Sequence, residues 1–434
     1  MKFSIAAAVF ACFFGGAIAA QRSPQRPPSI EDLPAVALPD QDLHVSAMRS
    51  FSNGLTSDST GRLWSLVQAV DRSAAARREL RLAWSSDHGR TWQSGATLPG
   101  AWAAYGAVAG EPRSNVLHLA WAGRREGDKW SCALYQRYDT EQQAFLGEPE
   151  ALQVGVGKQD QFGVADLAID AAGQVAVLVT THRRPQRPPW PSGWSSGLML
   201  RERGLGKWSK PYPLNTNTYG VWPSLQLHDG RAFAAYRTSP HGSVIGYRSF
   251  AVAARAFDQK DDVVVSRTTD GRAVANASSL LVDAFGGRTL VYPSARERGD
   301  FDGRLRIAYA EPGEDSWQTS VVVTDKRLQS GNLSHEHFAL VRGPGRQVVV
   351  LYSKVTEEHR VLYRRTYDGG QPMEAERVVA QSELAGAFRR ISAARDERLL
   401  SPVWALVSAN VDDPAAKYGV RAVLAPRVAP PRWQ

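Results

Sequence analysis

Histidine and arginine side chains recur at the ends of apolar, strand-like stretches of this sequence. The stretch "VAVLVTTHRR" ends in His182, Arg183 and Arg184, and the stretch "RAFAAYR" ends in Arg237. A guanidinium group binds a carboxylate or sulfate through two parallel hydrogen bonds, and an imidazole can gain or lose a proton near neutral pH. These residue types at strand ends therefore indicate a site that holds an anionic ligand and can move a proton.

The candidate site residues lie at two matching positions, the start of one strand and the loop after the next strand. Tyr and Trp at the strand starts offer rings that stack on sugars, so the mixture of cationic and aromatic groups favours an acidic polysaccharide or oligosaccharide as the partner. The candidate catalytic residues are His182, Tyr219, Arg237, His335 and His337, and the candidate substrate-binding residues are Gln161, Trp222, Arg183, Arg184, His241, Arg296, Arg298, Lys354 and Arg390.

A metal pair is the alternative for His335 and His337, because residues two apart on a strand point to the same side. Glu336 points to the other side, and the sequence offers no evident third ligand. We therefore expect no metal at the site and no other cofactor, and the sequence contains no specific signal for a structural Ca²⁺ ion.

Each candidate belongs to one of seven similar units that begin roughly 50–60 residues apart. A unit contains a strand, a turn with Gly, a second strand, a third strand such as "SCALYQRY", and a weaker fourth strand such as "SVVVTD". This repeat predicts an all-β fold, a seven-bladed β-propeller of four-stranded antiparallel blades. The seventh unit lacks a clear fourth strand, and we expect residues 42–47, "DLHVSA", to supply it.

The stretch "SSDHGRTW", residues 85–92, follows the third strand of the first unit. Asp87 can accept hydrogen bonds from the backbone of its own turn, and Gly89 can adopt a positive φ angle. Trp92 is expected to fold back and pack between blades. This Asp box is therefore a structural staple and not a catalytic site.

The N-terminus predicts export. Lys2 precedes an apolar run that ends at Ala17-Ile18-Ala19, the pattern of a cleaved signal peptide, and the run is too short to span a membrane. We assign residues 1–20 to the signal peptide, 21–39 to a Pro- and Arg-rich tether, and 40–428 to the propeller of a secreted or periplasmic protein. The net charge of +9 fits an acidic partner, but no nucleic-acid-binding motif is present.

A propeller with an Asp box resembles the BNR-repeat, sialidase-like superfamily. The stretches "QDQFGVADLAIDAAGQVAVLVTTH" and "YGVWPSLQLHDGRAFAAYR" resemble most closely the propeller-type polysaccharide lyases, such as ulvan lyases, and the related rhamnose–glucuronate enzymes. His182, Tyr236 and Arg237 match that pattern. The resemblance implies β-elimination on a uronate-containing polysaccharide, with His and Tyr as base and acid and Arg neutralising the uronate carboxylate.

Two departures leave other functions open. Gln161 stands where the lyases have a first His, and Trp222 stands where they have a Tyr, although Tyr219 lies just upstream. An amide cannot act as a base, so a non-catalytic propeller that binds acidic glycans is one alternative. A sialidase-like glycoside hydrolase is the other, but the Phe/Tyr-Arg-Ile-Pro motif of sialidases is absent, and its carboxylate pair would have to come from Asp160, Glu297 or Glu357.

Overall fold

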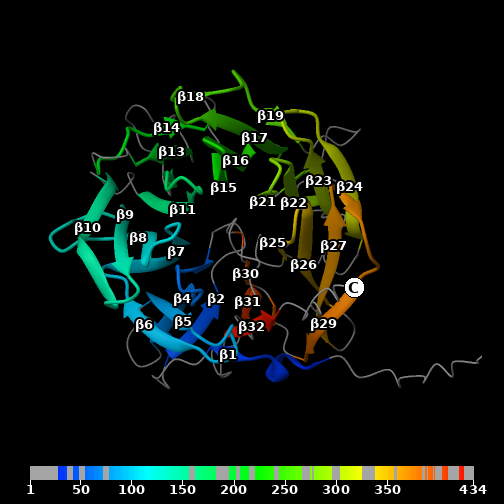
Figure 1. Ribbon diagram of the computed structural model, residues 1–434, viewed down its shortest axis with the longest axis horizontal. Coiled ribbons are helices and arrows are strands. Elements are labelled where there is room, and N and C mark those ends of the chain that lie inside the picture. Colours follow the sequence, from blue (N-terminus) through cyan, green and yellow to red (C-terminus); the bar gives the residue numbers. More distant parts are fainter. Residues whose placement is uncertain are drawn as a thin grey trace, which may run out of the picture.

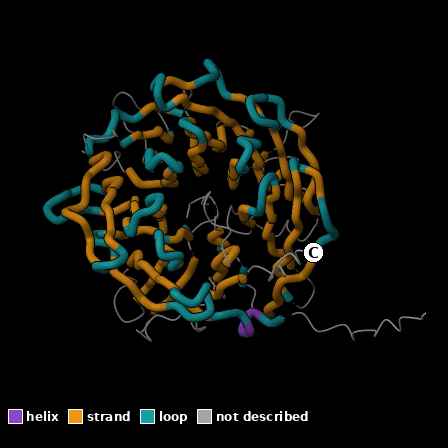
Figure 2. Tube along the Cα trace, viewed as in Figure 1, coloured by secondary structure: helices purple, strands orange, loops and turns teal. Residues whose placement is uncertain are grey.

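β-Strands arranged around a central axis make up nearly all the regular structure of the computed structural model (Figures 1 and 2). The structure describes residues 28–36, 43–47, 54–71, 78–155, 162–181, 195–201, 206–214, 220–238, 244–265, 274–275, 278–295, 304–324, 338–355, 359–383, 387–388, 390–393, 395, 403–408 and 420–424. Within these ranges the one helical element is a 3₁₀ turn, η1 (Ile30–Asp32).

The strands form seven antiparallel sheets, which are the seven predicted blades. Blade 1 contains β2 (Leu43–Ala47), β3 (Leu55–Ser57), β4 (Leu63–Asp71), β5 (Arg78–Ser85) and β6 (Gln93–Thr97). Blade 2 contains β7 (Ala101–Gly110), β8 (Val116–Gly123), β9 (Cys132–Asp139) and β10 (Ala144–Val154). Blade 3 contains β11 (Phe162–Ile169), β12 (Val175–Thr181), β13 (Ser196–Leu200) and β14 (Tyr212–Pro213).

The remaining blades repeat the same order. Blade 4 contains β15 (Gly220–His228), β16 (Arg231–Thr238), β17 (Val244–Ala251), β18 (Ala256–Phe257) and β19 (Val263–Val264). Blade 5 contains β20 (Val274–Ala275), β21 (Ser279–Val282), β22 (Arg288–Ala295), β23 (Arg304–Ala310) and β24 (Gln318–Thr324). Blade 6 contains β25 (Phe338–Arg342), β26 (Gln347–Val355), β27 (Arg360–Asp368), β28 (Gln371–Pro372) and β29 (Arg377–Ser382), and blade 7 contains β30 (Ile391–Ala393), β31 (Val403–Ser408), β32 (Val420–Leu424) and β1 (Ala35–Val36).

Burial explains why the second strand of a blade is an apolar run while the fourth is mixed. Neighbouring blades cover β12 on both faces, and all seven of its residues are buried. In the outer strand β10 only Leu152 is buried, and the other residues are partly buried or exposed, which admits Glu148 and Glu150. The described core divides into seven clusters, one at each interface between adjacent blades. Blade packing, at about 25 cal/mol per Å² of buried apolar surface, is therefore the main stabilising contribution.

The N-terminal segment closes the ring, but through a different strand from the one predicted. The prediction that residues 42–47 complete blade 7 is wrong, because β2 pairs with β4 inside blade 1. The short β3 covers only the first residues of β4, so the rest of that edge is open to β2. The fourth strand of blade 7 is β1, which pairs with β32 (Figure 1, where the blue and red ends meet). Ile30 is fully buried between blades 6 and 7, so residues 28–36, which the sequence assigned to the tether, pack against the propeller.

The Asp box forms the predicted staple. Asp87 accepts hydrogen bonds from the backbone N–H groups of Arg90 and Thr91 and from the Thr91 and Ser85 hydroxyls, at 2.6–3.0 Å. Gly89 has a φ of 82°. The Trp92 ring is buried in the cluster between blades 7 and 1. The turn is thus tied both to itself and to the neighbouring blade.

Candidate functional site

The propeller has two faces that differ in the connections they carry. The first-to-second and third-to-fourth strand turns lie at one end of the blades, which we call the turn face. The second-to-third strand connections and the starts of the inner strands lie at the other end, which we call the mouth face. The described strands that flank the candidate site residues begin or end at the mouth face.

The mouth-face candidates divide into those the structure describes and those it does not. Arg237, Lys354 and Arg390 are described, and Trp222 is described only as part of the backbone of β15. The other candidates lie outside the described residues: Gln161, His182, Arg183, Arg184, Tyr219, His241, Arg296, Arg298, His335 and His337.

Arg237 lies near the mouth-face end of β16, where it pairs with Val221 on one side and Ile245 on the other. It is half-buried. Tyr236 precedes it and points to the opposite side of the sheet, where its hydroxyl donates to Asp262 at 2.5 Å and to the Leu214 carbonyl at 3.0 Å. Burial raises the pKa of Tyr236 well above its usual value. Tyr236 therefore ties blade 4 to blade 3, while Arg237 lies on the other side of the sheet, near its mouth-face end.

Lys354 turns toward its own blade. Its ammonium group lies 2.7 Å from a carboxylate oxygen of Glu376 and 4.5 Å from the centre of the Tyr363 ring. The Lys354 side chain is 17% exposed. The same carboxylate accepts a hydrogen bond from the hydroxyl of Tyr352. The charge of Lys354 is thus already paired, which leaves less of it for an anionic ligand.

Arg390 links the two blades at the ring closure. Its guanidinium donates a 2.6 Å hydrogen bond to the side-chain oxygen of Gln68, a buried residue of β4. Arg390 precedes β30 of blade 7, and Gln68 lies toward the mouth-face end of blade 1. The contact places a guanidinium at the inner rim of the mouth face.

A fully buried ion pair crosses the propeller axis below the mouth. Arg395 follows β30 in blade 7, and its guanidinium lies 3.0 Å from the Asp166 carboxylate of blade 3. The same guanidinium donates to the Ser224 hydroxyl of blade 4 at 2.5 Å. In a ring of seven, blades 3 and 4 are the two that lie opposite blade 7, so Arg395 spans the axis.

Backbone groups complete this axial network. The N–H of Leu225 donates to Asp166 at 2.8 Å, and the N–H of Leu280 donates to Ser224 at 3.1 Å. The inner strands of blades 3, 4 and 5 are therefore joined side by side and tied to blade 7. This network, formed by Arg395, Asp166 and Ser224, lies below the mouth, and we call it the axial floor. Arg395 was not among the predicted site residues, because "AARDERLL" has the composition of an ordinary charged loop. The one signal in the sequence is Asp166, a carboxylate inside the apolar run "GVADLAI", which indicates a buried partner of opposite charge.

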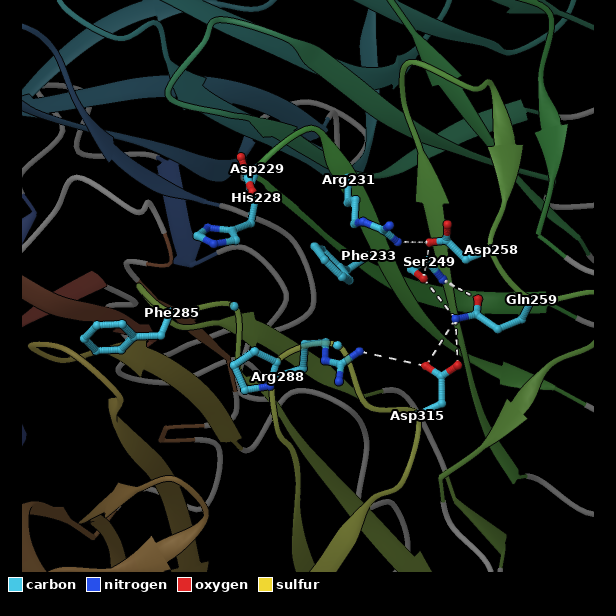
Figure 3. Close-up of a pocket in the computed structure, with 13 residues that line it drawn as sticks. His228, Asp229, Arg231, Phe233, Ser249, Asp258, Gln259, Phe285, Arg288 and Asp315 are labelled. Carbon is cyan, nitrogen blue, oxygen red and sulfur yellow. Dashed lines mark hydrogen bonds and ion pairs between the residues drawn. The ribbon is translucent and has the colours of Figure 1, made fainter.

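The turn face carries a cavity of about 370 Å³ between blades 4 and 5 (Figure 3). It lies beside the hairpin turns that join β15 to β16 and β21 to β22, and the third-to-fourth strand turns of both blades. None of the candidate residues from the sequence lines it. Its polar lining includes His228, Asp229, Arg231, Asp258, Gln259, Arg288 and Asp315.

Among the described residues, no group of three His, Cys, Asp or Glu side chains is placed to hold a metal ion. In the same part of the chain, no helix is long and apolar enough to cross a membrane.

Comparisons with known proteins identify the fold. No protein-family model matches the chain, and no curated protein matches its sequence. A polysaccharide lyase, an ulvan lyase bound to -[GlcA(1-4)Rha3S]-, superposes with a TM-score of 0.54 at 12% identity, covering 88% of this chain and 95% of that one. An oligogalacturonate lyase from Vibrio parahaemolyticus superposes with a TM-score of 0.52 at 10% identity, covering 91% and 93%. The fold is therefore a seven-bladed β-propeller, as the repeat predicted, and these lyases share the propeller fold.

Proposed function

We propose that this protein binds an acidic, uronate-containing polysaccharide at its mouth face and cleaves it by β-elimination. The observation that carries the proposal is the bias of cationic loops toward one face. The described ends of β8, β12, β16 and β22 all lead at the mouth face into segments that contain Arg or His. Cationic groups from several blades around one mouth attract a polyanion and hold its carboxylates.

The proposed reaction assigns the roles to residues of blades 3 and 4, with the two histidines that precede blade 6 as the alternative base. Arg237 binds the uronate carboxylate and makes the adjacent C5 proton more acidic. His182 accepts that proton, or one of His335 and His337 does so, and Tyr219 donates a proton to the leaving glycosidic oxygen. The C5–H and C4–O bonds break and a C4–C5 double bond forms, so the products are an unsaturated uronate and a new hydroxyl end.

The fold and the leader support this proposal from two directions. The fold is shared with a lyase bound to a glucuronate-containing oligosaccharide and with an oligogalacturonate lyase. An acidic polysaccharide is too large to cross a membrane freely, and the N-terminal signal-peptide pattern fits a protein that meets it in the periplasm or outside the cell.

The axial floor constrains how the polymer binds. Arg395 reaches across the axis to Asp166, which favours a polysaccharide that lies across the mouth over one that threads through the ring. A chain that lies across an open mouth can be cut at internal bonds.

The test uses the protein from Gln21 onward with a panel of uronate polymers, followed by the ultraviolet absorbance of unsaturated uronate. We expect a rise that is lost in Arg237→Ala and falls at least about 100-fold in His182→Ala, the usual scale of a general base. Arg90→Ala is the matched control, because Arg90 is exposed on the turn face and should leave the rate unchanged.

A non-catalytic role is the second candidate, and Gln161 at the position of a lyase His favours it. Salt-sensitive binding to the same polymers, without absorbance or new reducing ends, would establish binding alone. New reducing ends without absorbance would indicate a glycoside hydrolase.

A further inference from the structure

The cavity on the turn face is separate from the mouth and has its own chemistry. The Asp229-Gly230 turn forms one wall, and both residues have positive φ angles, 45° and 69°, as a tight two-residue hairpin requires. Gly286 and Gly313, also at positive φ, contribute no side chain to the opposite wall, which blade 5 forms. A volume of about 370 Å³ falls within the range of about 300–1,000 Å³ that small-molecule sites occupy.

The polar wall is fixed before any ligand arrives. The side-chain amide of Gln259 donates to both Asp315 oxygens at 3.2 Å and to the Ser249 hydroxyl at 2.9 Å. Arg288 donates to the Tyr247 hydroxyl at 3.1 Å and to two backbone carbonyls, and its guanidinium lies over the Tyr247 and Trp317 rings. A wall held in this way loses little entropy when it binds a ligand.

The charges of the cavity disfavour an anionic ligand. Arg231 lies 2.6 Å from Asp258, and Arg288 lies 3.9 Å from Asp315, so each guanidinium already faces a carboxylate. Asp229 adds a third, exposed carboxylate. The ligand that fits is therefore uncharged and rich in hydroxyl groups, which can donate to the carboxylates and accept from the outer N–H groups of Arg231, a side chain that is 51% exposed.

The cavity is also two-sided. In Figure 3 the rings of His228 and Phe285 lie to one side, and Asp258, Gln259 and Asp315 lie to the other. Phe285 is 65% exposed, the highest value among the large apolar side chains described. A pyranose ring has the same division, with an apolar C–H face and a hydroxyl edge, and aromatic side chains pack on the C–H face.

We infer that this cavity is a second carbohydrate site, specific for a neutral pyranose unit. It would hold a neutral sugar of the same polymer whose uronates bind at the mouth face, so the polymer identity rests on the proposed function, whereas the affinity for neutral sugars does not. Binding at two faces through one polymer raises the effective concentration of substrate at the mouth.

The experiment titrates the protein from Gln21 onward with a panel of neutral methyl glycosides, and with methyl glucuronide as the charged counterpart, by ligand-observed NMR. We expect at least one neutral glycoside to bind with an affinity that salt leaves unchanged, because no charge is involved. Phe285→Ala should weaken binding of this glycoside by roughly three- to tenfold, the usual value of one aromatic contact. Asp315→Ala should weaken the binding by a larger factor. Met373→Ala is the control, since Met373 is 54% exposed on blade 6.

Three results would overturn the inference: no neutral glycoside binds, methyl glucuronide binds as well as the neutral sugars, or the two cavity variants bind like the control. The His182→Ala variant separates this inference from the proposed function, because His182 belongs to the proposed mouth-face site and does not line the cavity. If polymer cleavage is absent from wild type while Phe285→Ala still loses neutral-sugar binding, the proposed function fails and the second site stands.

Discussion

Replacing Arg395 with Met tests whether the axial ion pair holds the ring together. Both side chains of the pair are fully buried, and the guanidinium makes two charge-assisted contacts, to Asp166 and Ser224. Removing one partner of a buried ion pair typically costs about 3–5 kcal/mol, because a charge is left in a medium of low dielectric constant. Asp166 keeps the N–H groups of Leu167 and Leu225, so we expect the lower half of that range.

The magnitude converts to a measurable shift. Unfolding entropy is about 2.1 cal/mol/K per residue, so a chain of 434 residues gives about 0.9 kcal/mol/K, and a loss in the lower half of that range, about 3–4 kcal/mol, lowers Tm by about 3–4 °C. Circular dichroism at a fixed scan rate measures it. The double variant Arg395→Met with Asp166→Leu removes both charges and should recover most of the loss, because apolar replacements of buried ion pairs are often neutral.

The double-mutant cycle decides between pairing and simple packing. A coupling energy of at least about 1 kcal/mol is expected for partners in direct contact. Additive effects of the two substitutions, or a Tm for Arg395→Met within about 1 °C of wild type, would refute the claim that this pair ties blade 7 to blades 3 and 4.

The remaining predictions concern single titratable groups. Desolvation opposes ionisation of Asp87, but hydrogen bonds from Thr91, Ser85 and the turn backbone outweigh it and lower its pKa to about 2. The contribution of Asp87 to stability is therefore complete above its unfolded pKa of 3.8 and is lost as the pH falls toward 2. The urea midpoint should fall over that pH range in wild type and less steeply in Asp87→Ala, and equal slopes would contradict the role of Asp87 in the turn. Burial lowers the pKa of His118 below 6.5, although Glu111 opposes this shift, so near that pH the unfolded chain binds a proton that the folded chain does not. Stability should therefore fall as the pH drops below 6.5. His118→Gln should flatten that part of the plot of urea midpoint against pH, and an unchanged plot would show that His118 does not cause the dependence. Burial, and to a smaller extent the nearby carboxylate of Asp128, raise the pKa of the Cys132 thiol to about 12. A thiol reagent at pH 8 should therefore label Cys132 only in denaturant. Rapid labelling of the folded protein would show that the thiol is accessible and contradict this prediction.

The repeat could be predicted because its signals are local. Gly-containing turns such as Asp170-Ala-Ala-Gly173 and apolar runs such as "VAVLVTT" need no knowledge of distant neighbours, and the third strands were predicted to within one to three residues. The pairing partner of a short strand is not local information. β1 and β2 are both brief, and which of them completes blade 7 depends on how much of the β4 edge β3 leaves open.

The site shows the same division. The described strands that flank the candidate cations have their ends on one face, and that order of strand ends could be deduced from the order of turns alone. The partners of individual cations could not be deduced. Lys354 contacts Glu376, and Arg390 contacts Gln68, but sequence spacing does not reveal which side chains the fold brings together. Arg395 is the extreme case, since its counter-charge lies on the far side of the ring.

The pairing of β1 with β32 has a consequence for biogenesis. Among the described residues, β1 is the first strand of the chain, and Ala35 and Val36 find their partners only when Val420 and Arg421 have been made. The strands of each of blades 1 to 6 are contiguous in the sequence, so these blades can form before the end of the chain is available, whereas blade 7 must stay incomplete until β32 has been synthesised. Truncation even a few residues into β32 should therefore leave an exposed strand edge on an otherwise folded ring, and such edges promote aggregation.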